Sequence, residues 1–282
     1  MTDTASRAVL ITGCSTGIGH ATAKHLAALG WTVVATARNV EKIAELERAG
    51  CTTLALDVTD EESMRSAVER VERDHGAVGV LVNNAGYSQS GTIEEVDLDT
   101  VRRQFETNVF GAVRMIQLVL PKMREQRWGK IVNMSSMGAH FVFPGGGYYH
   151  ATKYALDAIT DALRFEVKGF GIDAILIQPG LITTEFANTA TGGMGETADG
   201  SPYAEFNRRL IKSTKAVYEG PVSKLGGGPE AVAKVIEKAI TAKRPKARYL
   251  VTPSAHLLVN QRRLMTDRVW DALMRTQFPQ PR

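Results

Sequence analysis

The stretch TGCSTGIG, Thr12 to Gly19, follows the apolar run Ala8 to Ile11 and holds three glycines in eight residues. A strand that enters a glycine-rich turn and then a helix is typical of a phosphate-binding loop, because free N–H groups at a helix N-terminus attract anions. Gly13, Gly17 and Gly19 would let the backbone turn sharply and approach a pyrophosphate. The spacing G-x-x-x-G-x-G differs from the common dinucleotide fingerprint, so a simple tight turn is the alternative.

Short β-rich runs alternate with longer amphipathic segments along the chain, which is the pattern of βαβ units and a parallel sheet. Nearly all the expected strands are apolar, as in a sheet that is covered on both faces. The sequence therefore predicts one α/β domain over residues 1–282, with a doubly wound, mostly parallel, seven-stranded sheet of the Rossmann-like type. Strands are expected near 8–12, 32–36, 53–56, 78–83, 130–135, 173–178 and 248–251, and helices near 18–29, 40–48, 61–75, 98–125, 149–168 and 229–242.

Two segments depart from this rhythm. Residues 183–228 are polar and glycine-rich, with a helix expected at 203–218. Because this segment follows the C-terminal end of a strand, where such sheets bind ligands, we expect a substrate lid, with a disordered segment as the alternative. The C-terminal extension, about 252–282, carries an apolar stripe of Leu257, Leu258, Met265, Val269 and Leu273 beside basic residues. We expect this stripe to pack onto the domain or a second subunit, with contact to a membrane surface as the alternative.

Composition limits the possible functions. The chain of 282 residues is 44% hydrophobic and 23% charged, as in an ordinary globular protein. The net charge of +4 and pI near 9.0 come from interspersed charges, which favours a solvated surface over a nucleic-acid site. Two cysteines cannot form a disulfide framework, and no cluster has zinc-ligand spacing, so we expect no metal. Without a spanning apolar run or a signal pattern, we expect a cytoplasmic protein with no stable membrane insertion.

Residues that select a cofactor are expected at the ends of the second, third and fourth strands. Arg38 lies where an acidic residue would hold a ribose 2′-hydroxyl, whereas an arginine can hold a 2′-phosphate. This position favours NADP(H) over NAD(H), with an exposed arginine at a helix start as the alternative. Asp57 either accepts a hydrogen bond from adenine or forms a turn. The asparagines of Asn83-Asn84-Ala85-Gly86 either tie strand ends together or border the cofactor.

The sequence Tyr149-His-Ala-Thr-Lys153 carries the candidate chemistry. Tyrosine and lysine four residues apart share one face of a helix. A free tyrosine has a pKa of about 10, and a neighbouring ammonium moves that pKa toward neutrality. Tyr149 is therefore a candidate general acid for a carbonyl oxygen that receives a hydride. Ser135 and Ser136 end a strand at the same sheet edge, so one hydroxyl could bind the substrate oxygen. The alternatives are an ordinary helix pair for Tyr149 and Lys153, and a helix or turn cap for the serine.

With these motifs together, the chain resembles the short-chain dehydrogenase/reductase family from about residue 7 to residue 250. The resemblance rests on TGCSTGIG, NNAG, the strand-end serine, YxxxK and Pro179-Gly180. It implies a catalytic set of Asn, Ser, Tyr and Lys, in which Tyr149 and Lys153 fill the last two places. Ser136 matches the serine because it lies thirteen residues before Tyr149. Asn108, in TNVFGAV, matches the asparagine that anchors a water of the proton relay.

The same resemblance implies the cofactor contacts. Lys153 would also bind the nicotinamide ribose, and Thr184 would contact the carboxamide. Asn84 and Ala85 match residues that line the adenosine ribose, and Asp57 and Val58 match the adenine site. The expected cofactor-binding residues are Gly13, Ser15, Thr16, Gly17, Ile18, Gly19, Arg38, Asp57, Val58, Asn84, Ala85, Gly86, Tyr149, Lys153, Pro179, Gly180, Ile182 and Thr184.

Within the family, TGCSTGIG with ATAR, and ARYLVTP after AVAKVIEKAI, resemble the branch of estradiol 17β-hydroxysteroid dehydrogenases and photoreceptor-type retinol dehydrogenases. This implies an NADP(H)-dependent carbonyl reductase or alcohol dehydrogenase for a bulky apolar carbonyl or alcohol, assembled as a homodimer or homotetramer. A catalytically silent NADP-binding sensor or scaffold is the alternative. His150 is assigned no role. Apolar residues that either line the pocket or belong to the core are Tyr87, Phe141, Phe143, Leu181 and Phe186.

Overall fold

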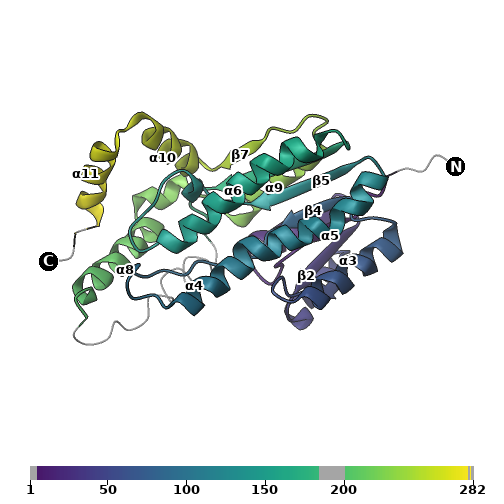
Figure 1. Ribbon diagram of the computed structural model, residues 1–282, viewed down its shortest axis with the longest axis horizontal. Coiled ribbons are helices and arrows are strands. Elements are labelled where there is room, and N and C mark those ends of the chain that lie inside the picture. Colours follow the sequence, from purple (N-terminus) through teal and green to yellow (C-terminus); the bar gives the residue numbers. More distant parts are fainter. Residues whose placement is uncertain (1–4, 184–200, 279, 281–282) are drawn as a thin grey trace.

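The computed structural model describes residues 5–183, 201–278 and 280. Its centre is one sheet of seven strands, all parallel, in the order β3-β2-β1-β4-β5-β6-β7 (Figure 1). This confirms the predicted doubly wound parallel sheet. The strands are β1 (Val9–Ile11), β2 (Val33–Ala37), β3 (Thr52–Ala55), β4 (Val80–Asn83), β5 (Gly129–Met134), β6 (Ile172–Pro179) and β7 (Arg248–Val251).

Helices cover both faces of the sheet, because alternate apolar side chains of each inner strand point to opposite sides. Val9 and Ile11 belong to one buried cluster and Leu10 to the other. The first cluster includes α1 (Gly17–Ala28), α2 (Ala44–Arg48) and α9 (Pro229–Thr241). The second includes α3 (Glu61–His75), α5 (Gly111–Glu125) and α6 (Gly147–Lys168).

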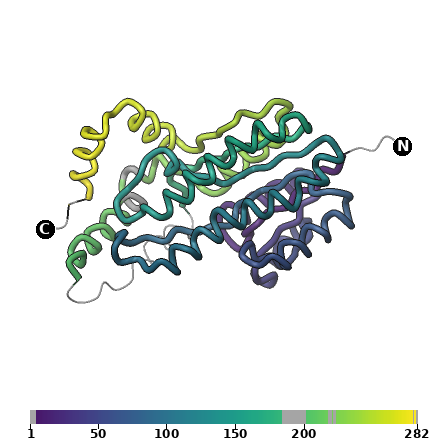
Figure 2. Tube along the Cα trace, viewed as in Figure 1, coloured from purple at the N-terminus to yellow at the C-terminus, as the bar shows by residue number. Residues whose placement is uncertain are grey.

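Further helices lie at the end of the molecule opposite the N-terminus, and the tube in Figure 2 shows how they gather there. They are α8 (Ala204–Glu219), α10 (Pro253–Leu264) and α11 (Asp267–Gln277). Short 3-10 segments lie at Val40–Ile43, Met137–Ala139 and Pro221–Leu225. The first of them replaces the beginning of the helix expected at 40–48.

The helix expected over 98–125 is not uniform. It begins as α4 (Leu98–Phe105), passes through a π-helical turn at Glu106–Phe110 and continues as α5. A π-turn adds one residue to the helical repeat and often occurs at functional sites. Here it contains Asn108, which is one of the predicted site residues.

The apolar stripe expected in the C-terminal extension is partly wrong. Leu257 and Val269 are 46% and 51% exposed, whereas Val259, Trp270 and Met274 are buried. The reason is that the helix is interrupted between α10 and α11. The two helices therefore have separate registers, and no single helical period runs through both. The extension nevertheless packs onto the domain as expected. Its buried side chains belong to the C-terminal cluster: Met137, Phe141, Leu181, Leu210, Ala255, Val259, Trp270, Met274 and Phe278.

Trp270 is the central anchor of α11 in this cluster, with its ring centroid 5.4 Å from that of Phe141. Truncation of a buried tryptophan removes apolar contacts and leaves a cavity. We therefore expect Trp270→Ala to lower the free energy of unfolding by about 3–5 kcal/mol in urea titrations. Val269→Ala, on the exposed side of the same helix, is the control and should change it by less than about 0.5 kcal/mol. Equal effects of the two variants would contradict the packing of α11 on the domain.

Candidate active site

The glycine loop leaves β1 and enters α1 with almost no space for side chains. Gly13 and Gly17 have φ values of +72° and +62°, which favour glycine. A Cβ on Gly13 would lie 2.8 Å from Cα of Ala85, and one on Gly19 would lie 2.4 Å from Nδ2 of Asn84. The glycines at these positions therefore allow both the backbone conformation and the close approach of the segment after β4.

Asn84 and Thr12 join the two loops. Nδ2 of Asn84 donates to the carbonyl oxygens of Thr12 and Gly13, at 2.9 Å each. The Thr12 hydroxyl accepts from the backbone N–H groups of Asn84 and Ala85, at 3.0 Å each. Asn83 has a different task, because its amide donates to Asn133 Oδ1 on β5 at 2.9 Å. The asparagine pair thus ties strand ends together, which is one of the two alternatives that the sequence left open.

The N-terminus of α1 is suited to an anion. Its N-cap residue, Thr16, makes no side-chain capping bond, so the first N–H groups of the helix are open to an external acceptor. Thr16 is exposed, and Ser15 and Ile18 are half-buried beside it. Together with the narrow glycine backbone, this arrangement fits the pyrophosphate of a dinucleotide.

The residues expected around the adenosine lie at the ends of β2 and β3. Arg38 directly follows β2, is exposed, and forms no ion pair with any residue that the structure describes. Asp57 follows β3, and its Oδ1 accepts from the backbone N–H and the hydroxyl of Thr59, at 2.9 and 2.7 Å. The turn-forming role of Asp57 is therefore present. Val58 is buried, and its carbonyl oxygen would lie 2.4 Å from a Cβ on Gly111.

Asn108 is buried, and its amide holds the segment after NNAG against α6. Its Oδ1 accepts from the N–H of Tyr87 at 3.0 Å, and its Nδ2 donates to the Tyr87 carbonyl at 2.9 Å and to the Thr152 hydroxyl at 3.2 Å. A Cβ on Gly86 would lie 3.1 Å from Asn108 Oδ1 and 3.8 Å from Lys153 Nζ. The structure thus brings Gly86, Asn108 and Lys153 together.

Lys153 is the most unusual group in the site. Its side chain is buried, its Nζ donates to the Met134 carbonyl at 2.8 Å, and this Nζ lies 5.6 Å from the centroid of the Tyr149 ring. Burial lowers the pKa of Lys153 from 10.5 to about 8, against the opposing charge of Asp157. A lysine at this position titrates near the pH at which enzymes work.

The two candidate serines have different surroundings. The Ser135 hydroxyl is buried and donates to Oδ1 of Asp157, away from the sheet edge. Ser136 is half-buried, and its Oγ accepts from the N–H of Gly138 at 3.0 Å, so its own proton can still be donated to a ligand. Of the two tyrosines, Tyr148 donates to the Ile93 carbonyl at 2.9 Å, whereas Tyr149 neighbours Lys153.

The end of β6 supplies the last expected contacts. Pro179 ends the strand, and a Cβ on Gly180 would lie 2.4 Å from Ser254 Oγ and 2.5 Å from Thr252 Oγ1, which requires glycine at this crossing with α10. Ile182 is buried and forms a bridge with Gly227. Thr184 and Phe186 lie outside the described residues. Phe141 and Leu181, offered as pocket residues, are core residues of the C-terminal cluster.

His150 has a structural role that no sequence pattern indicated. Its Nε2 accepts from the N–H of Phe143 at 3.3 Å, and its Nδ1 lies 2.8 Å from the Gly138 carbonyl. The ring is therefore neutral, with the proton on Nδ1. It fixes the segment 137–143, which begins next to Ser136. Burial lowers the pKa of His150, consistent with the neutral form.

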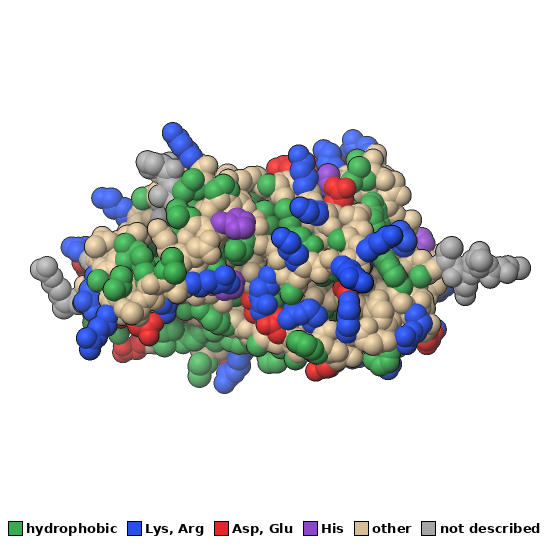
Figure 3. All heavy atoms as spheres, turned by 90° about the horizontal axis from the view of Figure 1, so that it is seen from above, with side chains coloured by type: hydrophobic (Ala, Val, Ile, Leu, Met, Phe, Trp, Pro, Cys, Tyr) green, Lys and Arg blue, Asp and Glu red, His purple; other side chains and the backbone are tan. Residues whose placement is uncertain are grey.

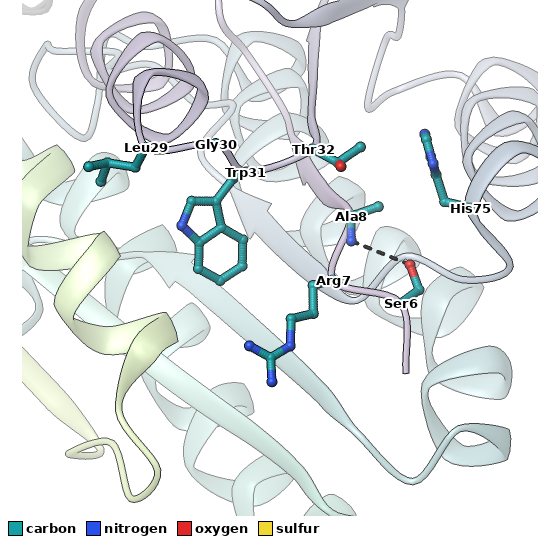
Figure 4. Close-up of a pocket in the computed structure, with 8 residues that line it drawn as sticks. All are labelled: Ser6, Arg7, Ala8, Leu29, Gly30, Trp31, Thr32 and His75. Atoms are coloured by element: carbon teal, nitrogen blue, oxygen red, sulfur yellow. Dashed lines mark hydrogen bonds between the residues drawn. The ribbon is translucent and has the colours of Figure 1, made fainter. Parts of the chain in front are cut away.

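A pocket of about 390 Å³ is not this site. It is lined by residues that precede β1 and β2, including Arg7 and Trp31, and by His75 at the end of α3 (Figure 4). It therefore opens at the amino ends of the strands, whereas parallel sheets of this type bind ligands at the carboxyl ends. The hydroxyl of Ser6 and the N–H of Ala8 are bonded to each other there, at 3.3 Å. We assign no chemistry to this pocket.

The surface carries no single charged stripe on the face seen in Figure 3, where Lys and Arg side chains are spread along the molecule with acidic and apolar groups among them. Among the described residues, no helix has the length and hydropathy to cross a membrane. Within the same part of the chain, no group of three or more His, Cys, Asp or Glu side chains could hold a metal ion.

Comparison with known proteins places the chain in a family. A family model for short chain dehydrogenases matches residues 7–194. The chain is 35% identical over 278 residues to the NADPH-dependent 3-dehydrocapnine reductase of Ornithobacterium rhinotracheale, covering 95% of each protein. It is 36% identical over 252 residues to the 3-ketodihydrosphingosine reductase of Bacteroides thetaiotaomicron, covering 89% of each.

A crystal structure of a short-chain dehydrogenase from Streptomyces avermitilis is similar, with a TM-score of 0.79 and 32% identity over 95% of both chains. The narrower resemblance to the 17β-hydroxysteroid and retinol dehydrogenase branch stays a prediction. The parallel sheet, the glycine loop and these matches together show that the chain belongs to the short-chain dehydrogenase/reductase family of oxidoreductases.

Proposed function

We propose that this oxidoreductase uses NADP(H) to reduce the ketone of a bulky, largely apolar substrate to a secondary alcohol. The observation that carries the proposal is the buried ammonium of Lys153, which lies beside Tyr149 and Gly86 at the edge that also carries the glycine loop. A buried cation has a large energetic cost, so a position next to a phenol and an anion-binding loop suits catalysis better than stability. Two relatives are named as reductases, which supports the same direction.

The proton chemistry follows from the side chains. When bound, the reduced nicotinamide supplies a hydride to the carbonyl carbon of the substrate. The Tyr149 hydroxyl gives its proton to the carbonyl oxygen, and the Lys153 charge stabilises the phenolate that remains. The Ser136 hydroxyl donates to the same oxygen and so holds it beside Tyr149. Asn108 orders the water of the proton relay and fixes the Tyr87 backbone at the wall of the site.

The preference for NADP(H) rests on Arg38. Its guanidinium is exposed at the end of β2 and has no acidic partner among the described residues, so it is available to a 2′-phosphate. One relative is named as NADPH-dependent, which supports this choice. The remaining cofactor contacts are proposed at the glycine loop, Asp57 with Val58, the NNAG segment and the end of β6.

The substrate is proposed to enter beneath the segment 183–228, of which the structure describes the part from Ser201 onward. The beginning of α8 is held by Glu95, which accepts from Ser201, from Asn207 at 2.9 Å and from Thr92 at 2.9 Å. Residues 184–200 lie outside the described part of the chain. The cytoplasmic location and the homodimer or homotetramer stay predictions, as does the absence of a nucleic-acid partner.

The charge on Lys153 opposes folding. Its pKa is about 8 in the folded chain and 10.5 in the unfolded chain, so the folded state binds this proton less tightly. The cost of the charge is therefore fully present below about pH 8 and disappears as the pH rises to about 10.5. At about 1.4 kcal/mol per pKa unit, it amounts to roughly 3 kcal/mol near neutral pH.

We expect Tyr149→Phe to reduce kcat by about 10²- to 10⁴-fold, because the general acid is lost. NADPH oxidation with 3-ketodihydrosphingosine and a panel of apolar ketones measures kcat, and NADPH fluorescence measures cofactor binding, which should stay within about threefold. Tyr148→Phe is the matched control and should retain turnover, since the Tyr148 hydroxyl donates to the Ile93 carbonyl, away from Lys153. An active Tyr149→Phe enzyme would refute the assignment. Wild-type protein that binds NADPH but reduces no ketone would favour the sensor or scaffold.

We expect Arg38→Asp to weaken NADPH relative to NADH, because it replaces a guanidinium partner of the 2′-phosphate with a repelling carboxylate. A charged hydrogen bond contributes about 1.5–3 kcal/mol, so the ratio of the two dissociation constants should change at least about tenfold. Lys42→Asp makes the same charge change on an exposed side chain nearby and is the control. Equal changes in both variants would show that Arg38 makes no specific contact.

We expect Lys153→Met to abolish turnover yet raise the free energy of unfolding at pH 7 by about 1–2 kcal/mol. It removes the buried charge but leaves the Met134 carbonyl without its donor, which offsets part of the gain. The gain should vanish toward pH 10.5, as urea titrations across this pH range would show. Lys130→Met is the control and should destabilise, because buried Lys130 contacts Asp173 at 2.6 Å. A destabilised Lys153→Met at pH 7, with no pH dependence, would contradict the cost of this charge.

A further inference from the structure

Four chemically important side chains recur at every fourth position of α6: Tyr149, Lys153, Asp157 and Asp161. Residues four apart lie one turn from each other on the same helix face. Lys153 and Asp157 are both only 7% exposed, which is rare for charged side chains. The function proposed above uses Tyr149 and Lys153. It leaves the buried carboxyl group of Asp157 unexplained.

The hydrogen bonds that Asp157 accepts favour its carboxylate form, whereas burial raises the pKa of its carboxyl group above the usual value. The Ser135 hydroxyl donates to its Oδ1, and the Gln178 amide donates to its Oδ2 at 2.7 Å. The orientation of Gln178 is fixed in turn, because its Oε1 lies 3.1 Å from Nε2 of His140. Both oxygens of Asp157 therefore accept hydrogen bonds, as an ionised carboxylate requires.

Among the described residues, the charged and titratable groups that interact with Asp157 lie on α6, on β7 and after the 3-10 turn that follows β5. Lys153, Tyr154 and Asp161 lie on α6, and Arg248 lies on β7 with its Nε 3.8 Å from Asp157 Oδ2. His140 follows the 3-10 turn after β5 and acts on Asp157 as a nearby charge when protonated. Arg248 contacts Asp161 more closely than Asp157, so it does not neutralise Asp157 alone.

Lys153 and Asp157 form no contact ion pair in the described structure, although the charge of Asp157 favours the ammonium of Lys153. Ser135 and Gln178 hold the carboxylate one helical turn away. Within the described part of the chain, Lys153 Nζ donates to the Met134 carbonyl instead. A direct salt bridge would draw the ammonium away from Tyr149. A carboxylate held at a distance stabilises the positive charge of Lys153. It also leaves N–H groups of Lys153 available to a ligand.

We propose that Asp157 is a positioning residue of the reaction: its fixed carboxylate is the counter-charge that keeps Lys153 protonated next to Tyr149. This role rests on the proposed reductase function for its purpose, but the electrostatic link itself is a property of the protein without cofactor. It requires that loss of the Asp157 charge makes Lys153 easier to deprotonate. Burial lowers the pKa of Lys153 and the charge of Asp157 raises it, so removal of that charge leaves the effect of burial unopposed by Asp157.

The test is a titration of Lys153 by NMR in protein labelled with ¹³C at the lysine ε carbon, with its signal identified by its disappearance in Lys153→Met. Asp157→Asn keeps the size of the side chain but removes its charge and one of its two acceptor oxygens. We expect this variant to lower the pKa of Lys153 by half a unit or more. Asp161→Asn removes the same charge one turn farther along and should change that pKa by less than about 0.2 units. Equal shifts in the two variants would overturn the proposal.

The alkaline limb of kcat/KM for ketone reduction gives the second reading. It should move to lower pH in Asp157→Asn by the same amount as the Lys153 titration. An NMR shift without any reductase activity in the wild type would support the electrostatic link and refute the proposed function. If Asp157→Asn does not fold, Arg248→Gln replaces it, and this loss of a neighbouring positive charge should raise the pKa of Lys153. An unchanged or lower pKa in Arg248→Gln would overturn the proposal.

Discussion

The structure depends on the hydrogen bonds between the loop after β1 and the loop after β4. These two strands are neighbours in the sheet although two others separate them along the chain, so the chain leaves them in opposite directions. A crevice forms wherever the strand order reverses in this way. Thr12 and Asn84 span it with four hydrogen bonds that use both backbone and side-chain atoms. The glycine backbone, the NNAG segment and, through Asn108, the helix α6 are all held in place by this contact.

Behind the crevice lies an unusual amount of buried polarity. Asn83, Asn133 and Thr160 form one chain of hydrogen bonds across β4, β5 and α6. Ser135, Asp157 and Gln178 form another beneath the sheet edge. Most polar groups of these two networks have partners, and a partnered network fixes one arrangement of its members; among the described residues, Asn83 Oδ1 is buried without a partner. The buried charge of Lys153 is therefore surrounded by hydrogen-bonded networks that cannot easily rearrange around it.

The sequence predicted the sheet because its strands are nearly continuous apolar runs with turn residues after each of them. It predicted Gly13, Ser136, Tyr149 and Lys153 because each stands at a fixed offset from a strand end or from another motif. The π-turn around Asn108 could not be predicted, since one added residue hardly alters an amphipathic pattern. The break between α10 and α11, at the extended residues Met265 and Thr266, was not predicted either, and the predicted stripe was wrong at Leu257 and Val269.

Asp157 and His150 were missed because their partners come from other elements. Asp157 contacts Ser135, at the end of β5, and Gln178 of β6, and no spacing along the sequence relates these residues.

The hydrogen bonds of His150 have a wider consequence. Gly138 donates its N–H to Ser136, and its carbonyl oxygen lies at the His150 ring, so the serine and the imidazole hold this glycine from both sides. A second proton on that imidazole would break its bond from Phe143. Acid would therefore loosen the loop beside Ser136 through a histidine that takes no part in the proposed proton transfer.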